Sequence, residues 1–242
     1  MRLSLQLYTL RDAMAADAEG TLDKVRSMGL EYVELAGAYG RPPAEFAETL
    51  REQGLLVSGA HVGIESLETD FATVVDEARL FDCEWVIVPY IGQDRRDWSE
   101  LAKTFDALGR RLAGEGLKFA YHNHDFEFGE EQGLRKLVAE TDPDTVFFQL
   151  DLGWAKNAGE DPAALMREFG TRAPLVHLKD MAPSQENIHV TAGDGEIDWT
   201  ATLAACAEVG VEYGSIEMDR PPTDPIEDTR RCVEFFHGRG VR

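Results

Sequence analysis

Imidazole and carboxylate groups recur at the ends of short apolar segments in this sequence. His122 ends one such segment, Asp151 ends the next, His177 lies in a third and Glu217 ends a fourth. Five of the six histidines, all except His237, lie at the carboxyl side of an apolar segment. Imidazole and carboxylate that converge on one point form a mixed nitrogen and oxygen site for a divalent ion such as Mn²⁺, Mg²⁺, Co²⁺ or Zn²⁺.

The same groups have a second interpretation, as a buried hydrogen-bond network without a metal. Alternation along an extended segment places His122 and His124 on one face and Asn123 on the other. Asp151 and the polar ends of the later segments can then share that face. Four such groups on successive segments are hard to assign to chance, but the chemistry alone leaves both interpretations open.

The elements that would position these residues follow a repeating pattern. Short apolar runs alternate with amphipathic helices at about 30 residues per unit, the size of one βα repeat. We expect strands at 3–7, 32–35, 55–61, 85–88, 117–122, 146–151, 174–178 and 213–217. We expect helices near 19–28, 43–53, 69–82, 97–115, 131–140, 161–169, 198–209 and 225–238.

This pattern predicts an α/β fold, a (β/α)8 TIM barrel that forms a single domain over residues 1–242. The runs are almost continuously apolar, as in parallel strands that helices cover. An open doubly wound sheet is the alternative, and the absence of GxGxxG after the first strand disfavours it. In such a barrel the active site lies where strands end and βα loops begin, so the polar strand ends should meet there.

Composition excludes some partners. The chain has 24 Lys and Arg against 45 Asp and Glu, a net charge of −21, so nucleic acid and anionic membranes are poor partners. No apolar run is long enough to span a bilayer. Three scattered cysteines without a CxxC, and a polar first segment at 1–12, predict a cytoplasmic protein with reduced thiols.

Several motifs resemble one known group of barrels. They are YHNHDFEF (121–128), QLDLGWAKNAG (149–159), VHLKD (176–180), GDGEIDW (193–199) and EMD (217–219). With these, the chain resembles the sugar phosphate isomerase/epimerase superfamily, the xylose-isomerase-like TIM barrels, over essentially its whole length. That group includes tagatose 3-epimerase-like enzymes, inosose dehydratases and enzymes that act on 3-keto-glycosides.

The resemblance implies a metal site and shows one departure from the family pattern. Asp151, His177 and Glu217 match three of the usual ligands, whereas His122 stands where many members have a glutamate. Glu127 is an alternative for that position if its loop folds back. Two carboxylates and two imidazoles around a divalent ion sum to zero charge instead of −1, which makes the ion a stronger Lewis acid.

The resemblance also implies a reaction. We expect a metal-dependent isomerase or epimerase of a small sugar or keto-sugar, which removes a proton next to a carbonyl and passes through an enediolate. Glu217, His124 and Lys179 are the acid and base candidates, although Lys179 is also a candidate for a salt bridge to Asp180 or Glu217. Because His122 replaces one of two paired glutamates, a lyase or dehydratase of the inosose or 3-keto-glycoside type is the alternative.

The remaining expectations concern substrate contacts and the less favoured functions. The residues assigned to substrate binding are Glu34, His61, Trp154, His189 and Arg220, each with a structural alternative such as packing or an ion pair. An endonuclease on this barrel is opposed by the acidic charge, and a non-catalytic sugar-binding barrel would lack the metal. Related barrels often form dimers or tetramers, so a homo-oligomer is a modest expectation.

Overall fold

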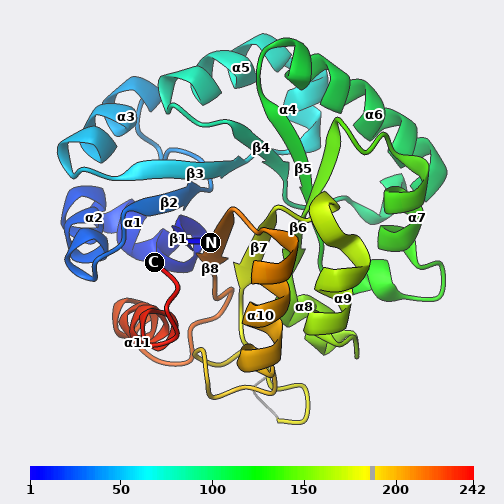
Figure 1. The fold of residues 1–242 in the computed structure, drawn as a ribbon. Coiled ribbons are helices and arrows are strands. Elements are labelled where there is room, and N and C mark those ends of the chain that lie inside the picture. Colours follow the sequence, from blue (N-terminus) through cyan, green and yellow to red (C-terminus); the bar gives the residue numbers. More distant parts are fainter. Residues whose placement is uncertain (186–188) are drawn as a thin grey trace.

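The computed structural model describes residues 1–185 and 189–242 and contains a closed parallel barrel (Figure 1). The strands follow chain order around the barrel from β1 to β8, and β8 pairs with β1. Their bounds are β1 Arg2–Gln6, β2 Tyr32–Leu35, β3 Leu56–His61, β4 Trp85–Val88, β5 Lys118–His122, β6 Val146–Asp151, β7 Leu175–Leu178 and β8 Tyr213–Ile216. The predicted TIM barrel is confirmed, with strand ends within two residues of those expected.

The helices form the outer layer of the barrel. Those that match the predicted ones are α2 Ala18–Ser27, α3 Pro43–Glu52, α5 Phe71–Leu80, α6 Trp98–Gly114, α7 Gly133–Glu140, α9 Pro162–Phe169, α10 Trp199–Val209 and α11 Pro225–His237. Within residues 1–185 and 189–242, three further helices were not predicted: α1 Arg11–Ala16, α4 Ile64–Thr69 and α8 Leu152–Asn157. Each has six residues, which is too short to show a helical period in the sequence.

Four 3₁₀ turns were also missed among the described residues, and three of them, η1, η2 and η3, lie in loops at the carboxyl end of the barrel. Their bounds are η1 Leu7–Leu10, η2 Gln93–Arg95, η3 Phe126–Phe128 and η4 Gly170–Arg172. Both η1 and η3 come soon after a strand, η1 directly after β1 and η3 a few residues after β5. The carboxyl side of the barrel is therefore built from short helical turns that hydrophobic periodicity does not predict.

The strand register lines up the inward-facing residues in layers. Asp151 pairs with His177, His122 pairs with Gln149, and His177 pairs with Ser215. Because register partners point to the same face of a sheet, these side chains all face the inside of the barrel. Towards the amino end, the interior is filled by the apolar cluster of Trp85, Ile87, Ala120 and Leu175. The polar groups therefore occupy the carboxyl half of the interior.

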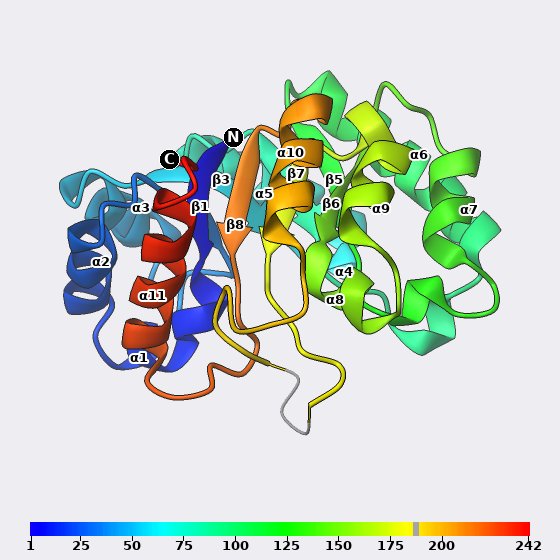
Figure 2. The same cartoon turned by 60° about the horizontal axis from the view of Figure 1, so that its bottom comes forward.

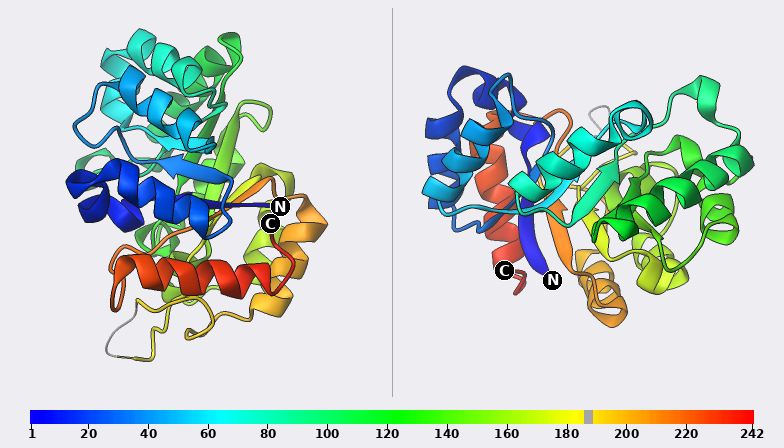
Figure 3. Two further views of the ribbon diagram at one scale, coloured as in Figure 1. Left: turned by 90° about the vertical axis from the view of Figure 1, so that its left-hand side faces the viewer. Right: turned by 90° about the horizontal axis from the view of Figure 1, so that it is seen from above.

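The two chain ends meet at the amino end of the barrel, away from those polar groups (Figures 2 and 3). The backbone N–H of Leu3 donates to the carbonyl oxygen of Arg242 over 2.6 Å. Figure 3 shows α11 beside α1 and α2, where it completes the ring of helices. In Figure 2 the described residues between β7 and α10, 179–185 and 189–198, lie at the opposite, carboxyl end.

The last expectations about the fold concern membrane-spanning helices and the cysteines. No helical segment within it combines the length and the apolarity that crossing a membrane requires. Cys83, Cys206 and Cys232 are free, buried thiols, as predicted.

Candidate metal centre

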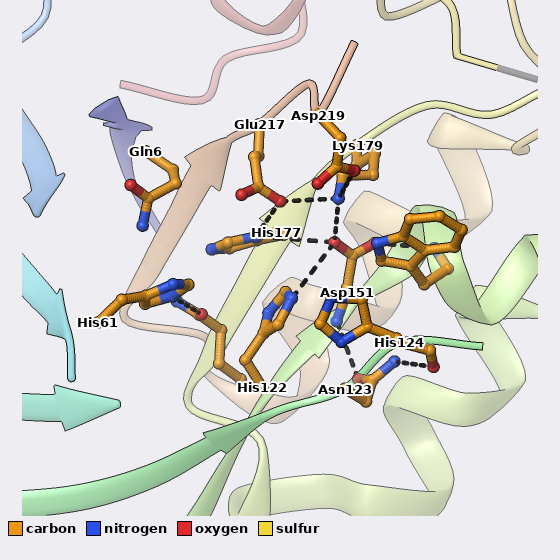
Figure 4. A network of polar contacts seen from close by, with 12 residues as sticks. Gln6, His61, His122, Asn123, His124, Asp151, His177, Lys179, Glu217 and Asp219 are labelled. Atoms are coloured by element: carbon orange, nitrogen blue, oxygen red, sulfur yellow. Dashed lines mark hydrogen bonds and ion pairs between the residues drawn. The ribbon is translucent and has the colours of Figure 1, made fainter. Parts of the chain in front are cut away.

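The four side chains predicted as metal ligands meet at the carboxyl end of the barrel (Figure 4). His122 ends β5, Asp151 ends β6, His177 lies in β7 and Glu217 follows β8 directly. One nitrogen or oxygen atom from each lies within 4.8 Å of the others, and all four residues are buried. Two imidazoles and two carboxylates at this spacing are a suitable donor set for a divalent ion.

The cluster already holds one cation and leaves one buried nitrogen unpaired. Oδ2 of Asp151 faces Nζ of Lys179 at 2.9 Å, whereas Nδ1 of His122 is buried and has no hydrogen-bond partner within residues 1–185 and 189–242. Burial, with a contribution from His177, lowers the pKa of His122 well below its ordinary value. Its imidazole is therefore neutral at neutral pH and has a lone pair to offer. A buried polar atom without a partner is costly, and a bound ion would satisfy the imidazole of His122.

His177 is held from both sides. Its Nδ1 lies 2.9 Å from Oε2 of Glu217 and 3.6 Å from Oδ2 of Asp151, and its Nε2 lies 2.7 Å from Oε1 of Glu34. Burial lowers the pKa of His177, but the charges of Glu217 and Glu34 outweigh burial and raise the pKa well above its ordinary value. A histidine ligand commonly has a carboxylate on its second nitrogen, which is the arrangement found here.

Lys179 is the cation of the cluster, and it is almost completely buried. Its Nζ lies 2.9 Å from Asp151, 2.7 Å from Glu217 and 2.6 Å from Asp219. Burial lowers the pKa of Lys179, but these three carboxylates outweigh it and raise the pKa above its ordinary value. Of the two salt bridges weighed from the sequence, the one to Glu217 is present, whereas Asp180 bonds to other groups.

The groups beside this cluster form an aromatic wall. The ring of His124 lies 5.1 Å from that of His122 and 5.7 Å from that of Trp154, centroid to centroid. Nζ of Lys179 lies 5.1 Å from the centroid of Trp154. Among the described residues, Nδ1 of His124 and Nε1 of Trp154 have no hydrogen-bond partner although both atoms are buried. Both atoms are therefore available to a ligand.

Glu34 and His61, which were expected as substrate contacts, lie in a hydrogen-bond network beside the cluster, and the expected role stays a prediction. Glu34 is 1% exposed and lies inside the barrel, where its oxygens accept hydrogen bonds from several strands. Nε2 of His61 lies 2.9 Å from Oε1 of Gln149 and 3.1 Å from Oε1 of Glu34, and its ring is stacked against that of His177. Glu34 has no free surface for a sugar hydroxyl, and the position of His61 indicates support for His177.

Glu127, the alternative ligand, lies outside the cluster. Its Oε1 accepts a hydrogen bond from the hydroxyl of Tyr121 and its Oε2 accepts one from the backbone N–H of His124. Burial raises the pKa of Glu127 to about 7. Glu127 thus braces the loop after β5 and, through the backbone, holds His124 next to the cluster.

The last two predicted substrate contacts come from neighbouring loops. His189 forms an isolated antiparallel bridge with Met181, and its ring meets the ring of Trp154 edge-on at 5.8 Å. Burial lowers the pKa of His189. Arg220 lies shortly after β8 and is exposed to solvent. Their roles as substrate contacts remain proposals.

Three residues of the site were not assigned from the sequence. Oδ1 of Asn123 accepts from the backbone N–H of Asp151 and so ties β5 to β6. Asp219 is the third partner of Lys179. Oδ2 of Asp180 accepts from the backbone N–H groups of Gly193 and Gly195 and from Nε1 of Trp199, which anchors the loop after β7. All three lie in the motifs YHNHDFEF, VHLKD and EMD, so their place in these motifs could have marked them as residues of the site.

Comparison with known proteins agrees with this geometry. A family model described as xylose isomerase-like TIM barrel matches residues 22–236. The chain belongs to this family. The resemblance expected from the motifs is thereby confirmed.

Two relatives illustrate the range of similarity within the xylose isomerase-like barrels. The chain is 29% identical over 167 residues to an inosose dehydratase of Clostridium tetani, a match that covers 60% of this chain and 55% of the relative. It is 25% identical over 241 residues to an inosose dehydratase of Geobacillus thermodenitrificans, which covers 87% and 78%. The chain spans about half the length of the first of these relatives.

A solved structure shows the same fold. A sugar phosphate isomerase/epimerase from Parabacteroides distasonis superposes with a TM-score of 0.85 over 97% of this chain and 92% of its own, at 19% identity. At that identity the likeness concerns the xylose isomerase-like fold alone, and the chemistry has to be argued from the residues.

Proposed function

We propose that this chain is a divalent-metal-dependent enzyme that removes the proton next to the carbonyl of a keto-sugar and then expels a hydroxyl group, as a dehydratase does. One observation carries the proposal: the site is chemically asymmetric. Glu217 lies 2.7 Å from the buried ammonium of Lys179, which also contacts Asp151 and Asp219. The other group placed for proton transfer is a neutral histidine, His124, where a symmetric epimerase would have a second glutamate. The relatives named inosose dehydratase support the same class of reaction.

The ion would be held by His122, Asp151, His177 and Glu217. Bound there, a divalent cation supplies a Lewis acid for the substrate carbonyl. Lys179 adds a fixed positive charge at 2.7 Å from Glu217 and 2.9 Å from Asp151. Because the raised pKa keeps Lys179 protonated, it stabilises negative charge that develops on a substrate oxygen.

His124 has the properties of the group that moves the proton. Burial and the charge of Lys179 lower its pKa, so the ring is neutral at neutral pH. Its Nδ1 is buried and has no partner in the described structure. A neutral ring can take the proton from carbon and, as imidazolium, return it to the hydroxyl that leaves from the next carbon. Nε1 of Trp154 is a donor for a substrate oxygen.

The second candidate is an isomerase or epimerase of a sugar or keto-sugar, acting through an enediolate. His124 and Glu217 both border the site, so a proton taken from one carbon and returned to its neighbour would give isomerisation. A small neutral sugar fits the acidic surface better than a nucleic acid does, since the net charge is −21. The endonuclease interpretation therefore receives no support.

One experiment separates the two reactions. Metal-supplemented protein is incubated in D₂O with ketoses, inososes and 3-keto-glycosides, and the products are analysed by mass spectrometry and NMR. A dehydratase gives a product lighter by one water, and an isomerase or epimerase gives an isomer that carries deuterium next to the carbonyl. If all substrates are recovered unchanged and without deuterium, the proposed proton abstraction is wrong.

A further inference from the structure

Glu34 has more hydrogen-bond partners than any role on a substrate would require. Its carboxylate lies inside the barrel, on the amino side of the metal cluster, and is 1% exposed. Oε1 accepts from Nε2 of Gln6 at 2.7 Å and lies 2.7 Å from Nε2 of His177. Oε2 accepts from Nε2 of Gln149 at 2.5 Å and from Oγ of Ser215 at 3.1 Å.

With Nε2 of His61 at 3.1 Å from Oε1, these partners come from β1, β3, β6, β7 and β8. One carboxylate on β2 thus receives groups from five other strands. A buried charge is tolerated when its oxygens are fully satisfied, and such a network holds each of its members in one orientation. The network is buried and centred on Glu34.

His177 is the member of this network that also belongs to the metal cluster. With Nε2 on Glu34, its Nδ1 faces Glu217 at 2.9 Å and Asp151 at 3.6 Å. A ring flip would exchange the two nitrogens, and the carboxylate of Glu34 opposes that flip. Gln6 shares Oε1 with His177, so it also fixes where this oxygen lies (Figure 4 shows Gln6 and His177 on the same side of the cluster).

We propose that Glu34 is a positioning residue that orients His177, with Nε2 towards the barrel interior and Nδ1 towards the ion. The part of this proposal that concerns the ion rests on the proposed function. The orientation itself does not, because it is a property of the protein without an ion. Glu34 acts through His177 and does not touch the substrate.

The test compares Glu34→Gln with Ser215→Ala. The amide of the variant has the size of the Glu34 carboxylate, but its NH₂ group replaces one of the two acceptor oxygens. The surrounding side chains that donated to that oxygen then have no acceptor. Second-sphere partners of metal-bound histidines change affinity by about 10- to 100-fold. We expect Glu34→Gln to weaken Mn²⁺ binding by that factor, measured by isothermal titration of chelator-treated protein. Ser215→Ala removes one of the bonds to Oε2, the oxygen of Glu34 that does not contact His177, and should change the affinity much less than Glu34→Gln does.

A second readout does not depend on metal. In ¹⁵N-labelled, metal-free wild type, the Nε2 proton of His177 should be shifted downfield and exchange slowly because it is hydrogen-bonded to Glu34. In Glu34→Gln this signal should move upfield and exchange faster, while Ser215→Ala retains it. If the wild type binds no Mn²⁺, the proposed function fails, and the His177 signal alone then tests whether Glu34 orients His177.

Folding is controlled separately. Circular dichroism and thermal unfolding show whether Glu34→Gln folds. If it does not, Glu34→Asp replaces it, because this variant keeps the negative charge on a side chain that is shorter by one methylene. We expect Glu34→Asp to fold and still to lose the slowly exchanging signal. Unchanged Mn²⁺ affinity together with an unchanged His177 signal, in either folded variant, would overturn the proposal.

Discussion

At the scale of single residues, the site depends on which charges are fixed and which proton can move. Lys179 lies within 2.9 Å of Asp151, Glu217 and Asp219, so its ammonium is held by three carboxylates. It therefore acts as a permanent cation and not as a proton donor. In the proposed mechanism, proton transfer is assigned to His124, whose lowered pKa leaves it neutral.

The role of His124 gives a first prediction. His124→Gln should lower kcat by about 10²- to 10⁴-fold, the usual contribution of a general acid or base. Mn²⁺ affinity should stay close to that of the wild type, because His124 is outside the ligand set. The control is His237→Gln at the end of α11, which should retain full activity. A His124→Gln enzyme with normal turnover would remove His124 from the mechanism.

Glu127 gives a prediction about pH. Its pKa is raised from 4.5 to about 7 in the folded protein, so the folded state binds this proton more tightly than the unfolded chain does. The resulting stabilisation is complete below pH 4.5 and is lost as the pH rises to 7, by about 3 kcal/mol. Glu127→Gln cannot titrate. Urea unfolding of both proteins across this range should therefore show the wild type losing stability relative to Glu127→Gln, whereas parallel curves would contradict the shift.

At the scale of elements, parallel register brings the site together. Asp151 is the Cα partner of His177, and Gln6 is the partner of Glu34, so residues far apart in the chain share one layer of the interior. Packing of the helices against the strands keeps this layer in place. One close contact of this kind involves Gly109 of α6, where an added Cβ would lie 2.5 Å from the carbonyl oxygen of Thr145, just before β6.

This contact predicts that Gly109→Ala destabilises the protein by about 1–3 kcal/mol, since α6 would have to move away from the start of β6. Gly114, in the last turn of the same helix, is the matched control because a Cβ there meets nothing within 4 Å. Gly114→Ala should be neutral or stabilise the helix by up to about 1 kcal/mol. Equal unfolding free energies for the two variants would show that the α6 contact is not tight.

Much of this arrangement could be predicted from the sequence, and the reasons are physical. The strands were predictable because buried parallel strands are continuously apolar, and the proposed metal ligands were predictable because each lies at or near the carboxyl end of such a run. The six-residue helices α1, α4 and α8 were not, since they are too short to show periodicity. The interior position of Glu34 was also missed, because it depends on partners from five strands and not on local sequence.

At the scale of the whole molecule, salt affects the acidic surface charge more strongly than the buried charges of the site. The net charge of −21 lies largely on exposed side chains, where it is screened by salt. Surface ion pairs, such as Arg135 with Glu160 and Glu168, are weakened by salt as well. Because acidic groups outnumber basic ones by 45 to 24, repulsion should dominate the overall response.

We therefore expect moderate NaCl to raise the melting temperature of chelator-treated protein. Each kcal/mol of relieved repulsion corresponds to a shift of about 2–4 °C for a chain of this size. Differential scanning calorimetry between low and physiological ionic strength measures the effect. A melting temperature that falls with salt would show that the surface ion pairs outweigh the excess charge.

The central claim is that four buried side chains hold a divalent ion that the reaction requires. Isothermal titration of chelator-treated protein with Mn²⁺ tests it most directly, with Asp151→Asn as the comparison. We predict one ion per chain for the wild type, with turnover that EDTA removes and Mn²⁺ restores. Asp151→Asn should remain folded but bind the ion far more weakly. A wild type that takes up no divalent ion, or an Asp151→Asn variant that binds it equally well, would contradict the account.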